Sequence, residues 1–274
     1  VGTNAQGDAV ALGGSAADSL ATSGGHATLS GGRGNDTLAA TGNDNTFVYA
    51  TGDGTDHVST GGTGNVLALG PGIVAADLKL KLGSLALQVG GDPADTIHFE
   101  SFDAANALGS RPFDSIRFDD GTSLAYADLL AQGFDLAGTA GNDVITGTSV
   151  ADRIDGGAGN DSLRGGGGSD TYLWGTGGGQ DTIDNTDATP GKTDTLKIGS
   201  ETDFIAPEQL AFVRSGNDLI VRRREATDQV TVLNHYAGAP IDAIEFADGK
   251  QLTSRLVGGA AVCAANESIK KKVA

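Results

Sequence analysis

The feature that most constrains this chain is a run of four consecutive nine-residue repeats at positions 138–173. Each copy begins with glycine, carries aspartate at its sixth place and carries an apolar residue at its eighth place. The aspartates are Asp143, Asp152, Asp161 and Asp170, and the apolar residues are Ile145, Ile154, Leu163 and Tyr172. A solvated Gly/Asp linker has no reason to keep an apolar residue at every ninth position, so the run predicts a regular folded structure.

Each repeat combines a glycine-rich turn with a short strand. Glycine accepts backbone angles that a Cβ disfavours, so the first six places can turn tightly and direct carbonyl oxygens inward. The last three places can form a strand whose middle side chain, the apolar eighth place, faces one side. A turn that offers carbonyls and one carboxylate makes half of a calcium site, because calcium takes about six to eight oxygen ligands. A second turn has to supply the other half.

A second copy of the same pattern lies 125 residues earlier. Residues 13–48 also divide into four nines, and adding 125 to their starting positions gives the starting positions of the later four. The correspondence continues through 46–56, which aligns with 171–181 without a gap. The sequence therefore predicts a duplicated module. Its parts are 1–12 as a degenerate repeat or linker, 13–136 and 137–257 as the two modules, and 258–274 as a tail.

The second half of each module has a different character. Strand-like stretches occur at 85–89 and 95–99 in the first module and at 218–222 and 228–232 in the second. Each module then ends with Asp-Gly between two alternating runs, at 114–124 and 242–252. Asp-Gly in this setting is a strong signal for a β-hairpin. Only 125–132 has a helical pattern.

The composition excludes several classes of protein. Aromatic residues make up 5% of the chain and 44 of 274 residues are glycine, which suits a solenoid with many small cores. The formal net charge of −17 argues against nucleic acids and anionic membranes as partners and favours cations. A single cysteine, Cys263, excludes an intrachain disulfide framework, and no stretch is apolar enough for a membrane span. Because the chain starts at Val1 without a visible signal peptide, we expect a fragment of a larger protein.

The repeats and the strands that follow them resemble the haemolysin-type calcium-binding RTX family. The resemblance covers roughly 13–255, and the closing Ile-x-Phe-x-Asp-Gly stretches resemble the calcium-binding-related segments of large bacterial exoproteins. It implies an all-β fold of two tandem parallel β-rolls, an RTX solenoid, each continued by flanking strands and a closing β-hairpin. It also implies a protein that is secreted or at the cell surface and folds there on binding calcium. The implied partners are calcium and, through the parent protein, the type I secretion machinery.

In that family one coil of the roll uses two repeats, so turns on the same edge are 18 residues apart. Carried over to this chain, the resemblance implies about three Ca²⁺ ions in the second module. The implied ligands are Thr139, Gly141, Asp143, Gly156, Ala158 and Asp161 for the first, Thr148, Val150, Asp152, Gly165, Gly167 and Asp170 for the second, and Gly157, Gly159, Asp161, Thr176, Gly178 and Asp181 for the third. The third pairing spans 20 residues instead of 18.

Shifting these positions by 125 implies about two Ca²⁺ ions in the first module. The residues are Gly14, Ala16, Asp18, Gly31, Arg33 and Asp36 for one ion, and Gly32, Gly34, Asp36, Thr51, Asp53 and Asp56 for the other. The opposite edge carries Ala27 and Asn45 where the second module has Asp152 and Asp170, while the apolar eighth places are kept. We therefore expect the first roll to fold with one calcium site lost, and to unfold earlier as calcium falls.

Catalysis has little support in the sequence. None of the four histidines lies in an H-E-x-x-H motif, and no G-x-S-x-G motif occurs. The Asp92-Pro93 bond invites comparison with self-cleaving relatives, but Gly-Gly-Asp-Pro is also an ordinary turn. We expect a non-enzymatic, calcium-folded module that serves secretion, stability and spacing. The alternative is an adhesive or glycan-binding module, for which Trp174 and Tyr236 are the candidate surface aromatics.

Overall fold

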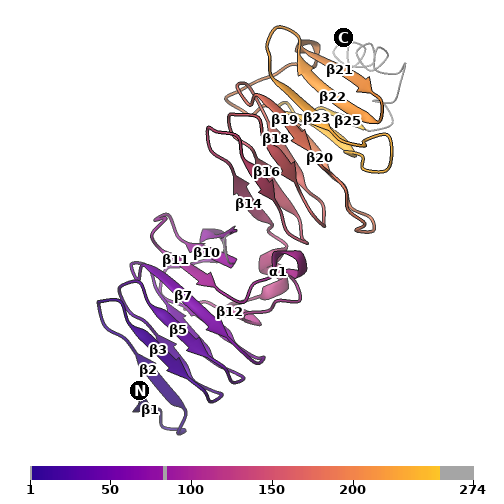
Figure 1. The fold of residues 1–274 in the computed structure, drawn as a ribbon. Helices are drawn as coiled ribbons and strands as arrows, with labels where there is room; N and C mark the ends of the chain where they lie inside the picture. The colour runs from indigo at the N-terminus through magenta and orange to yellow at the C-terminus, as the bar shows by residue number, and fades with distance from the viewer. Residues whose placement is uncertain (1, 83–84, 254–274) are drawn as a thin grey trace. The chain divides into compact units, whose positions relative to one another are not determined.

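A computed structural model gives the fold and describes residues 2–82 and 85–253. The expected tail at 258–274, which includes Cys263 and a run of lysines, lies outside these residues. The chain forms two compact units, Val1–Phe134 (unit 1) and Asp135–Ala274 (unit 2). Both units consist almost entirely of β-strands (Figure 1).

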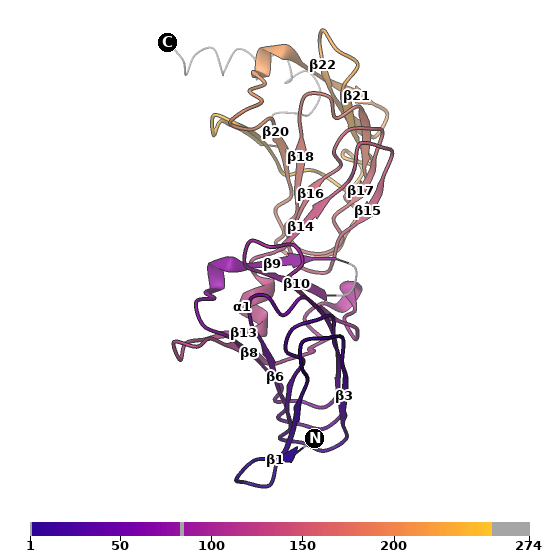
Figure 2. The same cartoon turned by 90° about the vertical axis from the view of Figure 1, so that its left-hand side faces the viewer.

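In unit 1 the repeats wind into a parallel β-roll whose successive strands alternate between two sheets. One sheet contains β2 (Ala9–Leu12), β4 (Thr28–Ser30), β6 (Thr46–Tyr49) and β8 (Val66–Leu69). The other contains β3 (Ser19–Thr22), β5 (Thr37–Ala40) and β7 (Thr55–Thr60). Neighbouring strands within each set run parallel. Figure 2 shows β6 and β8 in one layer and β3 in the other.

The register of these strands explains the core of unit 1. Thr28 pairs with Thr46, and Thr46 pairs with Val66 in the next coil. This register stacks the eighth-place residues on one another. They are Leu29, Phe47 and Leu67 in one sheet and Leu38 and Val58 in the other. All five are at most 2% exposed, so the core is a narrow column of apolar side chains between the sheets.

The flanking segments of unit 1 continue the roll. β11 (Thr96–Phe99) adds to β7 in parallel, and β10 (Leu85–Val89) and β9 (Leu78–Lys81) follow it antiparallel. β12 (Ser115–Arg117) adds to β8 in parallel and forms the predicted hairpin with β13 (Ser123–Ala125). The predicted helix at 125–132 is confirmed as α1 (Tyr126–Leu130). Short 3-10 helices lie at η1 (Ala75–Asp77) and η2 (Ala104–Asn106).

The first residues of the chain belong to the roll. β1 (Gly2–Thr3) pairs antiparallel with β2. β2 in turn pairs parallel with β4, with Val10 opposite Thr28, which is the 18-residue offset of the repeats. Of the two expectations for 1–12, the structure therefore favours a degenerate repeat over a linker.

Unit 2 repeats this architecture. One sheet contains β15 (Val144–Thr146), β17 (Ser162–Arg164), β19 (Gln180–Ile183) and β23 (Gln229–Val232), followed by the antiparallel β22 (Asp218–Arg223) and β21 (Leu210–Ser215). The other contains β16 (Asp152–Asp155), β18 (Thr171–Trp174), β20 (Thr195–Ile198) and β24 (Ala243–Phe246), with β25 (Gln251–Thr253) closing a hairpin. β14 (Phe134–Ala137) begins at the last residue of unit 1, and η3 (Pro207–Gln209) precedes β21.

The same stacking builds the core of unit 2. Ile154, Tyr172, Leu196 and Ile244 lie side by side on the second of these sheets, and each is at most 2% exposed. The predicted fold class is thus confirmed: each unit is a parallel β-roll that flanking strands and a hairpin continue.

Candidate calcium-binding edges

The turns of each roll collect at its two edges, and hydrogen bonds join the sixth-place residues into one ladder along each edge. The first-edge ladder consists of Asp18, Asp36 and Asp56 in unit 1 and of Asp143, Asp161 and Asp181 in unit 2. The second-edge ladder consists of Ala27, Asn45 and Asn65 in unit 1 and of Asp152, Asp170 and Asp194 in unit 2. The structure therefore brings together the aspartates that the 18- and 20-residue spacings pair.

One oxygen of each ladder carboxylate accepts a hydrogen bond from a backbone N–H. The N–H of Asp143 donates to Oδ1 of Asp161 at 2.9 Å, and the N–H of Asp161 donates to Oδ1 of Asp181 at 3.0 Å. On the second edge, the N–H of Asp152 donates to Oδ1 of Asp170 at 3.0 Å. These bonds fix the direction of each side chain, and they leave Oδ2 to find another partner.

At three rungs this second oxygen has no hydrogen-bond partner among the described residues. Oδ2 of Asp36, Asp161 and Asp170 is buried and unpaired there. A buried carboxylate oxygen without a partner is costly, so each position calls for a donor or a cation. These three residues are the second rungs of the three predicted pairs that keep the 18-residue spacing.

The first-place glycines hold open the space beside these oxygens. An ideal Cβ on Gly165 would lie 2.0 Å from Oδ2 of Asp170, and one on Gly156 would lie 2.3 Å from Oδ2 of Asp161. In unit 1 the corresponding distance, from Gly31 to Oδ2 of Asp36, is 2.0 Å. Any side chain here would displace the carboxylate, and the lack of one leaves room for a ligand of that oxygen.

The glycines at the second and fourth places bring neighbouring turns close together. Gly157 and Gly159 have φ values of 85° and 130°, which L-residues with a side chain rarely adopt. A Cβ on Gly157 would lie 2.2 Å from the carbonyl oxygen of Thr139, and one on Gly159 would lie 2.5 Å from that of Gly141. The implied carbonyl ligands Thr139 and Gly141 are therefore packed directly against the next turn of the same edge.

The first rungs behave differently from the second rungs. Oδ2 of Asp143 accepts from the backbone N–H of Thr139 at 2.6 Å, and Oδ2 of Asp152 accepts from that of Thr148 at 2.6 Å. In unit 1, Oδ2 of Asp18 accepts from the N–H of Gly14 at 2.7 Å. Each of these carboxylates closes its own turn, so a cation between two turns would share the first-rung oxygen with a backbone donor.

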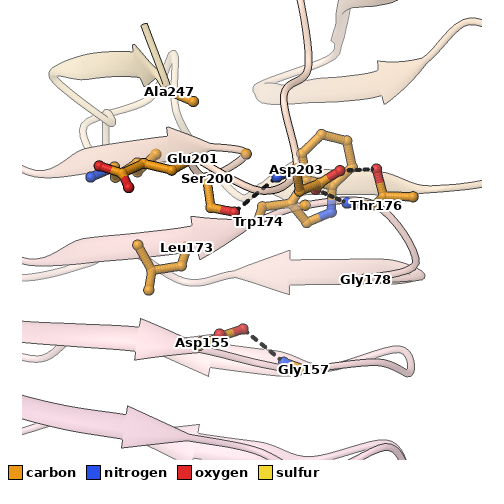
Figure 3. A pocket seen from close by; sticks show the side chains of 13 residues that line it. Asp155, Gly157, Leu173, Trp174, Thr176, Gly178, Ser200, Glu201, Asp203 and Ala247 are labelled. Atoms are coloured by element: carbon orange, nitrogen blue, oxygen red, sulfur yellow. Dashed lines mark hydrogen bonds between the residues drawn. The ribbon is translucent and has the colours of Figure 1, made fainter. Parts of the chain in front are cut away.

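The implied third site of unit 2 lies where the roll meets its flanking strands. Figure 3 shows Asp203 bonded to Thr176, whose N–H and hydroxyl donate to the carboxylate at 2.7 and 2.6 Å. The N–H of Gly177 donates to Oδ2 of Asp228 at 3.1 Å. Thr176, Gly178 and Asp203 line a hollow of about 470 Å³. Thr176 is therefore anchored by a flanking carboxylate, whereas Asp161 and Asp181 remain bonded in the ladder.

The corresponding turn of unit 1 is held in a similar way. Gly52 and Gly54 donate to Oδ1 of Asp95 at 3.0 and 3.4 Å. Oδ2 of Asp53, an implied ligand, accepts from the N–H of Ala50 at 2.8 Å and so closes its own turn. Asp36 and Asp56 stay paired, because the N–H of Asp36 donates to Oδ1 of Asp56 at 3.0 Å.

Burial and crowding of carboxylates make the edges electrostatically strained without a cation. Burial, reinforced by the charges of Asp152 and Asp194, raises the pKa of Asp170 to about 7. Burial, reinforced by Asp36 and Asp53, raises the pKa of Asp56 to about 7. Burial and the charge of Asp161 also raise the pKa of Asp181 to about 6. A divalent cation would relieve this repulsion.

The second edge of unit 1 satisfies itself without a cation. Nδ2 of Asn45 donates to the carbonyl of Gly42 at 2.6 Å, and Nδ2 of Asn65 donates to the carbonyl of Gly61 at 2.9 Å. The ladder itself continues, since the N–H of Asn45 donates to Oδ1 of Asn65 at 3.1 Å. The amide nitrogens thus bind turn carbonyls that carboxylates could not. This arrangement gives a physical reason for the expected loss of a calcium site on this edge.

The backbone of this edge also departs from the calcium-type turns. His26 and Asp44, at the fifth places of their repeats, have φ values of 59° and 58°. In the turns before Asp36, Asp161 and Asp170, the positive φ values fall instead on glycines at the second and fourth places. The carbonyls of this edge consequently follow a different path around the turn.

Sequence reasoning missed how the second-edge ladder of unit 2 continues. The N–H of Asp170 donates to Oδ1 of Asp194 at 2.9 Å, and the N–H of Asp194 donates to Oδ2 of Asp242 at 2.9 Å. The spacings of 24 and 48 residues hid these rungs from an 18-residue search. A local signal existed, because Asp194 begins the same Asp-Thr-apolar triplet as Asp36 and Asp170.

The donor set determines which cation the edges suit. Within residues 2–82 and 85–253, no group of three or more His, Cys, Asp or Glu side chains could hold a metal. A cation at an edge would therefore take one or two carboxylates and complete its shell with backbone carbonyls. Oxygen-only shells with many carbonyls suit calcium, whereas zinc prefers nitrogen and sulfur.

Comparison with known proteins agrees with this donor set. The model of the RTX calcium-binding nonapeptide repeat (4 copies) matches residues 12–47, 22–58 and 137–172. The model of the haemolysin-type calcium binding protein related domain matches residues 218–255. None of the helices in the described ranges has the length and apolarity needed to cross a membrane.

Two individual proteins show the extent of the similarity. Iron-regulated protein FrpA of Neisseria meningitidis serogroup C is 40% identical over 86 residues, which cover 30% of this chain and 7% of FrpA. Extracellular lipase LipA from Serratia marcescens aligns with a TM-score of 0.27 and 15% identity, over 83% of this chain and 38% of the lipase. The chain thus matches only a small part of the length of FrpA.

Proposed function

We propose, on the premise that residues 12–58 and 137–172 are RTX calcium-binding repeats, that both units fold around calcium held at the edges of their rolls. The observation that carries this proposal is that Asp36, Asp161 and Asp170 each have a buried oxygen without a hydrogen-bond partner in the described part of the chain. Each belongs to the second rung of a predicted pair, and each lies beside a glycine that a side chain would obstruct. Calcium would supply a cationic partner for each of these oxygens.

We assign about three ions to unit 2 and about two to unit 1. In unit 2 the carboxylate pairs are Asp143 with Asp161, Asp152 with Asp170, and Asp161 with Asp181. In unit 1 they are Asp18 with Asp36 and Asp36 with Asp56. Carbonyls of the intervening turns complete each shell, as the sequence resemblance implies. Bound calcium would supply positive charge and cross-link two turns, whereas the register of the strands sets how the coils stack.

The free energy of calcium binding is large enough to shift the folding equilibrium of each unit. Extracellular calcium modules have dissociation constants of about 10⁻⁴–10⁻³ M, so at millimolar calcium each site stabilises the fold by roughly 0.4–1.4 kcal/mol. The two or three sites of one unit together contribute roughly 1–4 kcal/mol, which approaches the lower end of the net stability of a small domain, roughly 5–15 kcal/mol. At submicromolar calcium the contribution is close to zero.

This calcium dependence suits a segment of a secreted protein. A chain that stays unfolded at cytosolic calcium is competent for export by a type I secretion system, and it folds on reaching millimolar calcium outside. We propose that the segment provides stability and spacing there and has no catalytic role of its own.

The alternative of an adhesive or glycan-binding module depended on two surface aromatics. Trp174 is 5% exposed, so its indole does not offer a stacking face to a ligand. The guanidinium of Arg214 covers one face of the Tyr236 ring, at 4.4 Å from the ring centroid. Neither side chain supports this alternative.

Circular dichroism and equilibrium dialysis with ⁴⁵Ca²⁺ test the proposal. We expect the β-sheet signal to appear between micromolar and millimolar calcium and to be lost in chelator, with magnesium unable to replace calcium. Asp170→Asn should lower the number of bound ions by one, whereas Asp119→Asn, in the exposed hairpin turn of unit 1, should leave it unchanged. An unchanged β-signal in chelator, or equal stoichiometry in the two variants, would contradict the proposal.

A further inference from the structure

One lysine of unit 2 is held among carboxylates in the loop between β19 and β20. The ammonium of Lys192 contacts Oδ2 of Asp187 and lies 2.6 Å from Oδ2 of Asp194. It also donates to the carbonyl oxygen of Asn185 at 3.2 Å. The side chains of Lys192, Asp187 and Asp194 are 14%, 8% and 0% exposed, so this ion pair is largely shielded from water.

Lys192 lies beside Asp194, which is a rung of the second-edge ladder. Oδ1 of Asp194 accepts the N–H of Asp170, as Oδ1 of Asp170 accepts the N–H of Asp152. The two rungs differ only at their second oxygen. Oδ2 of Asp170 is buried without a hydrogen-bond partner among the described residues, whereas Oδ2 of Asp194 faces the ammonium of Lys192.

The groups around the ammonium are also those of a calcium shell. Two carboxylates and a backbone carbonyl surround Nζ, which is the mixture of oxygen ligands that calcium uses in proteins. Ordinary surface pairs of unit 2 look different. Lys197 lies 4.0 Å from Glu245, and their side chains are 41% and 31% exposed.

We propose that Lys192 is a built-in cation that takes the place of calcium at the Asp194 turn of the second edge of unit 2. The inference rests on the calcium function proposed for the other turns. It assigns to Asp187, Asp194 and the carbonyl of Asn185 a latent calcium site that the ammonium fills.

The surroundings of the loop indicate what this substitution achieves. Nδ2 of Asn185 donates to Oδ2 of Asp194 at 2.8 Å and to the carbonyl of Pro240 at 2.6 Å, just before β24. Oδ1 of Asn185 accepts from the buried hydroxyl of Tyr172 in β18 at 3.0 Å. The lysine-centred cluster therefore fastens β20 and the start of the β24–β25 hairpin to the roll. The ammonium therefore offsets one of the two carboxylate charges of this junction at any calcium concentration.

Replacing the lysine by an uncharged residue of similar length tests the proposal. We expect Lys192→Met to bind one more calcium ion per chain than the wild type, measured by equilibrium dialysis with ⁴⁵Ca²⁺. Its folding midpoint, followed by Trp174 fluorescence, should move several-fold to higher calcium, because one more ion is then needed. Lys197→Met is the matched control and should change neither quantity. A variant that loses stability without gaining an ion would show an ordinary ion pair and overturn the proposal.

A second measurement on the wild-type chain decides the matter if Lys192→Met does not fold. Crystals grown in calcium and soaked in Tb³⁺ should give anomalous peaks beside Asp161 and Asp170 and none between Asp187 and Asp194. A peak between Asp187 and Asp194 would overturn the proposal. A failure of the proposed calcium function looks different, since the wild type would then bind no calcium at all. The protein would stay folded in chelator, and Lys192→Met would gain no ion.

Discussion

Three different residues fill equivalent positions on the ladders of this chain. Asp170 presents a buried carboxylate oxygen that has no hydrogen-bond partner among residues 2–82 and 85–253. Asn45 presents an amide that donates to the carbonyl of Gly42, and Asp194 presents an oxygen that contacts the ammonium of Lys192. The backbone part of the rung is the same in all three cases, because the side-chain oxygen accepts the N–H of the preceding rung. Under the proposed calcium function, the change from Asp to Asn replaces the cation by a hydrogen bond, and a lysine beside Asp194 supplies a cation of its own.

The raised pKa values of the ladder residues predict how calcium binding depends on pH. In the metal-free fold the pKa of Asp56 and that of Asp170 are raised to about 7, and that of Asp181 to about 6. An unfolded aspartate has a pKa of about 3.9, so the metal-free fold binds more protons than the unfolded chain in the interval between these values. Its stability from these groups is therefore greatest below about pH 4 and is lost as the pH rises through 6–7.

Calcium binds the deprotonated carboxylates and should release these protons. We expect calcium affinity to weaken as the pH falls below about 7, with proton release near pH 6 and little release at pH 8. Isothermal titration calorimetry in two buffers of different ionisation enthalpy measures the released protons directly. The same enthalpy in both buffers at pH 6 would show that the ladder carboxylates are already ionised without calcium.

At the scale of elements, the glycine-rich turn is the part of the repeat that tolerates least change. Gly157 and Gly177 both have positive φ, at 85° and 80°. A Cβ on Gly157 would lie 2.2 Å from the carbonyl oxygen of Thr139, whereas one on Gly177 would have no heavy atom within 4 Å. A substitution at Gly177 therefore tests backbone strain alone. A substitution at Gly157 tests backbone strain together with the close approach between turns.

We expect Gly177→Ala to cost about 1–2 kcal/mol, the ordinary penalty for an L-residue in the left-handed region. Gly157→Ala should cost clearly more and should also remove the calcium ion between the Asp143 and Asp161 turns, because the new methyl group displaces a carbonyl ligand. Thermal unfolding at saturating calcium and counting of bound ions provide the two readouts. Equal losses in both variants would mean that the spacing of the turns is not essential.

The extent to which the elements follow from the sequence depends on the period of the repeats. Where the spacing is 18 residues, the spacing together with the resemblance to the RTX family predicts the parallel strands and the pairing of Asp143 with Asp161. It fails where a coil lengthens, as between Thr55 and Thr96, which are parallel neighbours across a 41-residue excursion. The length of such an excursion is set by the packing of strands that leave and rejoin the roll. The repeat period therefore does not predict it.

The chemistry of the ladders was predictable only in part for the same reason. Aspartates at the sixth place stand out in the sequence, and so does their replacement by Asn45. The partners of that amide and of Lys192 depend on which carbonyls and carboxylates the turns bring near in space. A search for the Asp-Thr-apolar triplet would have found Asp194, but it would not have found the ammonium beside it.

At the scale of the whole molecule, the two units share one architecture and differ in the residues that form their second-edge ladders. In unit 1 the second-edge ladder is satisfied by the amides of Asn45 and Asn65, so we expect unit 1 to bind calcium only at its first edge. In unit 2 both edges carry buried carboxylates, with unpaired oxygens on Asp161 and Asp170 within the described part of the chain. Removing calcium therefore leaves more uncompensated charge in unit 2.

This difference predicts the opposite order of unfolding to the one that the loss of a site suggested from the sequence alone. The free energy of folding changes with calcium in proportion to the number of ions bound. With about three ions assigned to unit 2 and about two to unit 1, unit 2 should unfold first, and more steeply, as calcium falls. Trp174, the single tryptophan of the chain, lies buried in unit 2 and reports on that unit alone.

A calcium titration followed by two signals measures the order. We expect the fluorescence of Trp174 to shift to the red at a calcium concentration where circular dichroism still shows part of the β-sheet signal. The remaining signal, from unit 1, should disappear at lower calcium with a shallower slope. Asp170→Asn is the internal control, because it converts one calcium rung of unit 2 into the asparagine type of unit 1. This variant should make the fluorescence transition shallower, and fluorescence that changes only after the β-sheet signal has gone would contradict the order.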